Sequence, residues 1–124
     1  MIPLLVEASP GFSSRWREFQ AEWKDDKEGL PYYVCLGDFA RYLGEKLKEG
    51  DIGDFPAIFR VVERLHVESD SYVREAATVG LLEGIQNIHG ESAVKFVPYL
   101  EPETKRWWDK LNDFWETGKL LTND

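Results

Sequence analysis

The sequence predicts an all-α fold, a compact bundle of about five main helices. Apolar residues recur at intervals of three and four along most of the chain, which is the spacing of one face of a helix. Short breaks containing Gly, Pro, Ser and acidic residues separate these stretches, as they do in helical bundles. No stretch alternates apolar and polar residues between hairpin turns, so no sheet is expected.

The length of 124 residues suits one domain and is too short for two, so residues 1–124 are expected to form a single helical domain. Five Trp, seven Phe and five Tyr supply bulky side chains for its core. Cys35 is the only cysteine, so the chain cannot form an internal disulfide, and a buried structural thiol is expected.

A short helix at the N-terminus is expected to precede the first main helix. Ser13 or Ser14 can cap that main helix by accepting a hydrogen bond from a free backbone N–H. Its apolar face is a stripe of aromatic side chains at positions i, i+3 and i+7: Trp16, Phe19 and Trp23.

The next main helix is expected over residues 31–50. Pro31 can open it, because the first helical position needs no backbone donor, and Gly50 can close it in the left-handed conformation. Its apolar face follows the same helical spacing: Leu36, Phe39 or Ala40, Leu43 and Leu47.

Two further main helices, over residues 54–69 and 70–87, are expected to follow each other as a hairpin, with Asp54 and Asp70 as caps. Their apolar faces have helical spacing: Ile58, Val62 and Leu65, then Val73, Ala77, Leu81 and Ile85. A stripe of small residues lies on the second helix: Ala76, Gly80 and Gly84. Close approach of a neighbouring helix is the favoured reason for this stripe, and a partner surface is the alternative.

A short helix near residues 92–97 is expected before the last main helix, which Pro102 starts and Gly118 ends. The inner face of this last helix is aromatic and apolar: Trp108, Leu111 and Trp115, widened by Trp107 and Phe114. Together the helical faces predict the core: Trp16, Phe19, Phe39, Leu43, Val62, Leu65, Leu81, Trp108 and Leu111.

Residues 55–87 resemble one HEAT-type helical repeat, through Asp70, the VREAA run that begins at Val73, and Leu81. The HEAT family repeats its unit, whereas VREAA occurs once in this chain. The resemblance implies that Asp70 and Arg74 are structural, and their spacing of four also suits a helical ion pair.

The whole chain is similar to an uncharacterised group of small all-helical bacterial proteins, a domain of unknown function. The shared motifs are VERLHVE…YVREAA, here residues 62–77, and YLxPExxRWWDKLNxFW, here residues 99–115. Some members of the group neighbour polymorphic-toxin genes, so the resemblance implies an immunity-type role.

The charge is unevenly distributed. Of a net −8, residues 49–91 contribute −6, from nine acidic residues against three arginines. This field disfavours direct binding to nucleic acid and suits either a basic protein partner or solubility. The residues predicted to contact a partner are four glutamates opposite the apolar stripes: Glu63, Glu68, Glu75 and Glu83.

No stretch approaches the roughly 20 apolar residues of a membrane span, and the apolar run from Ile2 to Val6 is short, so a cytoplasmic protein without membrane contact is expected. His66 and His89 are the only histidines, and Glu63 could join His66 as a metal ligand. A histidine bonded to the last carbonyls of a helix is the favoured interpretation, because a metal site needs three or four ligands.

No phosphate loop, nucleophile elbow, HExxH or CxxC occurs, so no catalytic, cofactor-binding or metal-binding residue is assigned. The sequence therefore predicts a non-catalytic protein-binding domain with an acidic surface, of the immunity type if the partner is a basic toxin domain. The alternative is a small ligand-binding protein or enzyme with a pocket among its aromatics. A homodimer with a structural role also remains open, since the oligomeric state is not determined by the sequence.

Overall fold

The computed structural model describes residues 1–26 and 31–117, and side chains as far as residue 114. Every regular element in these two ranges is a helix, which confirms the all-α prediction. In chain order they are α1 (Ile2–Ala8), η1 (Pro10–Phe12), α2 (Ser13–Trp23), α3 (Tyr32–Glu49), α4 (Phe55–Val67), α5 (Ser71–Glu75), η2 (Ala76–Leu82), α6 (Glu83–His89), η3 (Gly90–Tyr99) and α7 (Pro102–Thr117). Gly118, predicted to end the last helix, and the Trp115 side chain lie outside the described residues.

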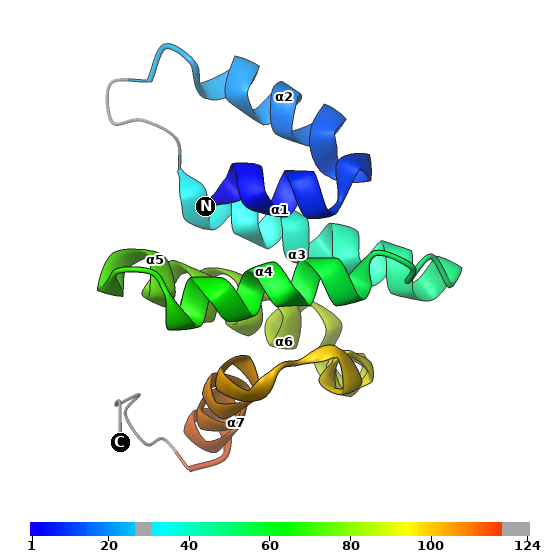
Figure 1. Cartoon of the computed structure of the whole chain (residues 1–124), viewed down its shortest axis with the longest axis vertical. Helices are drawn as coiled ribbons and strands as arrows, with labels where there is room; N and C mark the ends of the chain where they lie inside the picture. The colour runs from blue at the N-terminus through cyan, green and yellow to red at the C-terminus, as the bar shows by residue number, and fades with distance from the viewer. Residues whose placement is uncertain (27–30, 118–124) are drawn as a thin grey trace.

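The helices are stacked along the long axis of the molecule (Figure 1). At one end lies α2, followed by α1, then by α3 and α4, then by the segment from α5 to α6, with η3 and α7 at the other end. The predicted helical hairpin is present, with α4 as its first arm and residues 71–89 as its second. Its likeness to a HEAT repeat stays a prediction.

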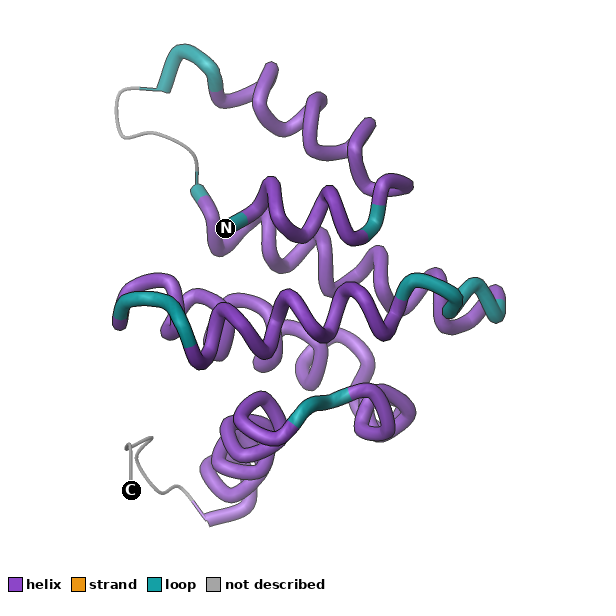
Figure 2. The backbone as a smooth tube through the Cα atoms, in the orientation of Figure 1, coloured by secondary structure: helices purple, strands orange, loops and turns teal. Residues whose placement is uncertain are grey.

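The second arm of the hairpin is one helix that changes its pitch. α5, η2 and α6 follow one another without an intervening loop (Figure 2), and η2 is π-helical over seven residues. Most of η2 is buried: Ala76, Ala77, Thr78, Gly80, Leu81 and Leu82. The η2 segment packs against α3, α4 and α7, which explains why residues on several sides of it avoid solvent.

Small residues bring this central helix close to α3, as the glycine stripe predicted. A Cβ atom added at Gly84 would lie 3.5 Å from the Cβ of Ala40. One added at Gly80 would lie 2.8 Å from Cδ1 of Leu36, which is closer than van der Waals contact allows. The alternative reading of the stripe as a partner surface is wrong for Gly80, because this residue is buried against α3.

Replacing Gly80 by valine should destabilise the fold by about 1–3 kcal/mol, because the new methyl groups would enter space already filled by Leu36. Gly37 offers a matched control within α3, since an added Cβ there meets nothing within 4 Å. The Gly37→Val change should alter the free energy of unfolding by less than about 0.5 kcal/mol, because valine and glycine differ little in helix propensity. Urea denaturation of both variants measures the difference. Equal losses at the two positions would contradict the proposed close packing.

The core confirms most of the predicted residues. Seven of them are buried: Phe39, Leu43, Val62, Leu65, Leu81, Trp108 and Leu111. Trp16 and Phe19 pack against the core but are only partly buried, so their prediction as core residues is confirmed only in part. The reason is the position of α2 at the end of the stack, where a neighbouring helix covers one side of it and nothing in the described chain covers the other.

The helix ends confirm the predicted cap at Gly50 and correct the caps predicted for α2 and α4. Gly50 closes α3 with φ 76°, and the N–H of Asp51 donates to the carbonyl of Lys46 at 2.8 Å, as expected for a glycine cap. No serine caps α2, because that helix continues directly from η1. Asp54 sits at the start of α4, yet its carboxylate binds the Ser9 hydroxyl and the buried Lys46 ammonium instead of the helix backbone.

Candidate functional site

A groove of about 500 Å³ separates α2 from α3. The apolar part of its lining comes from both helices: Phe19, Trp23 and Val34. The charged part does too: Arg15, Glu18, Glu22, Asp38 and Arg41. The N-terminal end of α2 follows directly from η1, and the groove lies along this helix beside α3.

Arg15 fastens α2 to α3 across this groove. Its Nη2 lies 2.7 Å from Oε2 of Glu45, and its Nη1 lies 3.8 Å from Oδ1 of Asp38. The guanidinium also sits over the Tyr42 ring, 5.2 Å from the ring centroid. These contacts neutralise Arg15 inside the protein, so its charge is not available to a molecule that enters the groove.

The aromatic stripe of α2 is only partly buried. Trp16 stacks on Phe19 with ring centroids 6.2 Å apart, and Phe19 lies 6.4 Å from Trp23. No residue of α2 is buried. Such partly covered aromatic side chains are the type that most often anchors protein interfaces.

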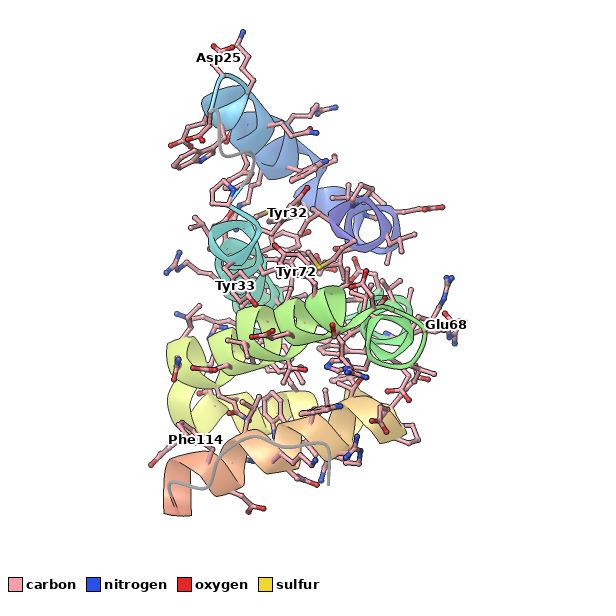
Figure 3. All side chains as sticks on the ribbon, turned by 90° about the vertical axis from the view of Figure 1, so that its left-hand side faces the viewer. Asp25, Tyr32, Tyr33, Glu68, Tyr72 and Phe114 are labelled. Carbon is pink, nitrogen blue, oxygen red and sulfur yellow. The ribbon has the colours of Figure 1, made fainter. Side chains whose placement is uncertain are left out.

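Exposed apolar residues continue from the groove over the N-terminal end of α3. Val34 is 59% exposed. Tyr32, Tyr33 and Tyr72 are also exposed and lie near one another in Figure 3. The pKa of Tyr33 is raised by partial burial, and then by the nearby charge of Glu75.

The four glutamates predicted to form one flank are not brought together. Glu63 points toward the start of α7, and Glu68 pairs with Arg64 at 2.8 Å at the end of α4. Glu68 lies on the opposite side of the molecule from Tyr33 (Figure 3), and Glu75 lies at the end of α5. Glu83, at the start of α6, is partly buried.

Asp70 forms the predicted cap, while the predicted ion pair is absent. Its Oδ1 accepts a hydrogen bond from the backbone N–H of Val73 at 2.9 Å, which satisfies a free donor of α5. Within the described chain no ion pair joins Asp70 to Arg74, because the carboxylate is turned toward the helix backbone.

His66 lies in a buried polar network between α4, η2 and α7. Its Nδ1 lies 2.9 Å from the carbonyl oxygen of Val62, which can only accept, so this nitrogen carries the proton of the neutral ring. Its Nε2 lies 3.0 Å from the hydroxyl of Thr78. His66 thus bonds a carbonyl within its own helix and not one of the last carbonyls, which corrects the favoured interpretation in that detail.

Glu63 belongs to the same network. Its carboxylate accepts hydrogen bonds from the backbone N–H groups of Glu103 and Thr104, at 3.0 and 2.7 Å, and from the Thr104 hydroxyl at 2.8 Å. Pro102 has no N–H, so these are the first backbone donors that α7 must satisfy. Glu63 thus caps a helix that begins about 40 residues further along the chain.

Protonation of His66 should destabilise the protein. Burial lowers the pKa of His66 below its ordinary value of 6.5, although Val62 and the charges of Glu63 and Glu103 act in the opposite direction, and Arg74 adds to the lowering. A lowered pKa means that the unfolded chain binds the proton more tightly than the folded protein does. The contribution of neutral His66 to the free energy of unfolding is therefore complete above pH 6.5, and it is lost as the pH falls toward the folded-state pKa.

Urea denaturation between about pH 7 and pH 5 measures this loss. The His66→Gln variant cannot titrate in that range, so its stability should depend less steeply on pH than that of the wild type. Parallel pH profiles for the two proteins would contradict the assignment.

The remaining candidates for chemistry are structural as well. Nε2 of His89 lies 2.9 Å from the carbonyl oxygen of Ala40, and its ring occupies the space beside Gly44. Burial, and then the charge of Asp38, raises the pKa of the Cys35 thiol to about 12, so the thiolate is scarce at neutral pH. Among the residues that the structure describes, no three His, Cys, Asp or Glu side chains are grouped to hold a metal ion.

A second depression, of about 440 Å³, lies between α6, η3 and α7. Polar and apolar side chains alternate around it, among them Gln86, Asn87, Val94, Trp108 and Asn112. The Gln86 amide donates to the carbonyl of Trp108 at 3.3 Å. Its Oε1 is buried and accepts no hydrogen bond within the described residues.

Sequence reasoning found the aromatic stripe of α2 but assigned it to the core. A signal of its exposure was present, because Ala21 is the only other apolar residue between Ser13 and Trp23, so the stripe is too narrow to be covered on both edges. The capping role of Glu63 had no such signal, since its partners lie about 40 residues away.

Within the described ranges, the chain contains no helix that is both long enough and apolar enough to cross a bilayer. No curated protein and no solved structure matches this chain. The profile of one family, described as a domain of unknown function (DUF7674), matches residues 2–116. Because that match covers almost the whole chain, the protein belongs to the DUF7674 family.

Proposed function

We propose that this protein is a non-catalytic protein-binding domain that uses the α2–α3 groove and the exposed residues beside it. The observation that supports this proposal is the partly buried aromatic stripe of α2, which borders the groove, in a helix that has no buried residue. Covering such a surface with a partner removes apolar area from water, which drives most protein association. An immunity-type role, in which the partner is a basic toxin domain, is the version of this function that fits the net charge of −8.

This proposal moves the partner surface away from the acidic region 49–91. The Glu63 carboxylate is hydrogen-bonded to the start of α7, and Glu68 forms an ion pair with Arg64. The acidic region can still speed the approach of a basic partner, because long-range attraction depends on the overall charge and not on direct contact.

Site-specific photo-crosslinking in the producing cells tests the proposal. A photoreactive residue at Val34, beside the groove, should crosslink to a discrete partner protein. Val67 is the matched control, because it is a valine of similar exposure, 62% against 59%, next to Glu68 in the acidic region. Crosslinking from Val67 and not from Val34 would return the partner surface to the acidic region. Absence of any crosslink at Val34 would overturn the proposed function, and a crosslink to a second copy would favour the homodimer.

Ligand binding in the second depression is the alternative function, favoured by the unsatisfied Oε1 of Gln86. A buried acceptor without a donor is costly, and a ligand with an N–H or O–H group could supply one. Small amides and alcohols that raise the melting temperature of the wild type, but not of a Gln86→Met variant, would support this alternative. Hits that stabilise both proteins equally would argue against it.

A further inference from the structure

We propose that the α2–α3 groove accepts a basic amphipathic helix of the partner protein. This inference rests on the proposed protein-binding function and adds to it the conformation and the charge pattern of the segment that binds. Three features of the groove support it: the kind of backbone that forms its walls, the unpaired charges on those walls, and the apolar side chains between them.

The walls favour a helix over an extended strand. Both walls are α-helices, whose backbone N–H and C=O groups are already bonded within each helix. An extended segment adds to a protein by pairing with a free sheet edge, and the described residues contain no strand. A helix satisfies its own backbone and can lie between two others through side-chain packing. The 11 residues of α2 span about 16 Å, which matches an occupant of about three turns.

The α2 wall carries negative charge without a partner. Glu18 and Glu22 are exposed, and neither forms an ion pair within the described chain. They stand four residues apart on the same helix face, where two like charges repel each other. Lysine or arginine side chains on a docked helix would relieve this repulsion.

The α3 wall carries the opposite charge. Arg41 is exposed and has no ion pair among the described residues, whereas Asp38 and Glu45 are occupied by Arg15. A helix that docks with its basic edge against α2 would therefore present neutral or acidic side chains to Arg41. This polarity fixes which edge of the partner helix faces each wall.

The apolar side chains between the walls supply the contact area. Phe19 and Trp23 from α2 meet Val34 from α3 around the groove. An amphipathic helix places apolar residues at i, i+3 or i+4, and i+7, so its narrow stripe can pack against these three side chains. Trp and other large side chains surrounded by such contacts commonly carry most of the binding energy.

The test uses the full-length protein and a fluorescent peptide of about 14 residues, built from leucine and lysine at helical spacing. Fluorescence anisotropy at about 0.15 M salt, where the Debye length is about 8 Å, measures binding with long-range attraction reduced. The Glu18→Lys/Glu22→Lys variant should bind the peptide at least about tenfold more weakly, because it turns two attractive contacts into repulsive ones.

The Glu49→Lys/Glu91→Lys variant is the matched control. It changes the net charge by the same amount, and both residues are exposed, form no ion pair in the described chain and lie outside the groove. Its affinity should change by less than about twofold. If both double variants weakened peptide binding equally, the peptide would be attracted by the overall negative charge of the protein and not by the groove. This result would overturn the inference.

A second variant tests the apolar contact. Val34 is 59% exposed, so Val34→Arg should leave the melting temperature unchanged while it weakens peptide binding. Unchanged binding by this folded variant would also overturn the inference. If a photoreactive residue at Val34 crosslinks to a partner but the groove variants bind the peptide as tightly as the wild type does, the proposed protein-binding function stands. The inference of a basic helix would then be rejected. Failure of crosslinking would reject the function itself.

Discussion

Replacing Phe59 by alanine is expected to lower the free energy of unfolding by about 3–5 kcal/mol. Phe59 is fully buried in α4, and its ring lies 5.9 Å from Phe55, 6.1 Å from Phe96 and 6.3 Å from Tyr99, measured between centroids. The change removes a large apolar side chain and leaves a cavity that three aromatic rings cannot easily close. Urea denaturation followed by circular dichroism measures the loss.

Phe19 provides the matched control, because it is the same side chain on α2 with only partial burial. Phe19→Ala should cost clearly less than Phe59→Ala, about 1 kcal/mol, since part of its ring already contacts water. Similar losses at the two sites would mean that α2 is as tightly packed as α4, and would remove the main support for a binding surface there.

Replacing Glu63 by alanine is expected to cost about 2–3 kcal/mol. The carboxylate receives three hydrogen bonds at the start of α7, and alanine would leave the N–H groups of Glu103 and Thr104 without an acceptor in a partly buried place. A negative charge is also favourable at the positive end of a helix, and this contribution is lost as well. Thermal or urea denaturation of the variant measures the total loss of stability from both causes.

Two further variants separate the causes. Glu63→Gln keeps an acceptor oxygen but no charge, so its stability should fall between those of the wild type and Glu63→Ala. Glu68→Ala removes an exposed carboxylate that pairs only with Arg64, and should cost less than about 0.5 kcal/mol. A Glu63→Ala protein as stable as Glu68→Ala would contradict the cap.

The fold was predictable because local signals agreed with the final packing. Gly50 ends α3 in the left-handed conformation that glycine adopts most easily, and Asp70 caps α5, both readable from a few neighbouring residues. The spacing of Val62, Leu65 and Leu81 identified buried faces, since helical period alone determines which residues point inward. The π-helical pitch of η2 had no local sequence signal, because it depends on the helices packed around it.

The candidate site was less predictable, because it depends on which surfaces remain uncovered. The helical spacing of α2 indicated an inward face, and Trp16 and Phe19 were assigned to the core because the narrowness of that face was not weighed. Acidic residues opposite the apolar stripes were assigned to an exposed flank, which failed for Glu63 because its hydrogen-bond partners are on a distant helix. Lys46, buried between Asp51 and Asp54, was also missed, although these partners follow it closely in the sequence.

The weak attachment of α2 has a consequence for local unfolding. Helices held by few buried contacts open without the rest of the molecule, at a free energy well below that of global unfolding. α2 has no buried residue and is fastened to α3 mainly through the Arg15 guanidinium, which contacts Glu45, Asp38 and the Tyr42 ring. Its backbone amides should therefore exchange with deuterium much sooner than those of α4, and a bound partner should slow that exchange.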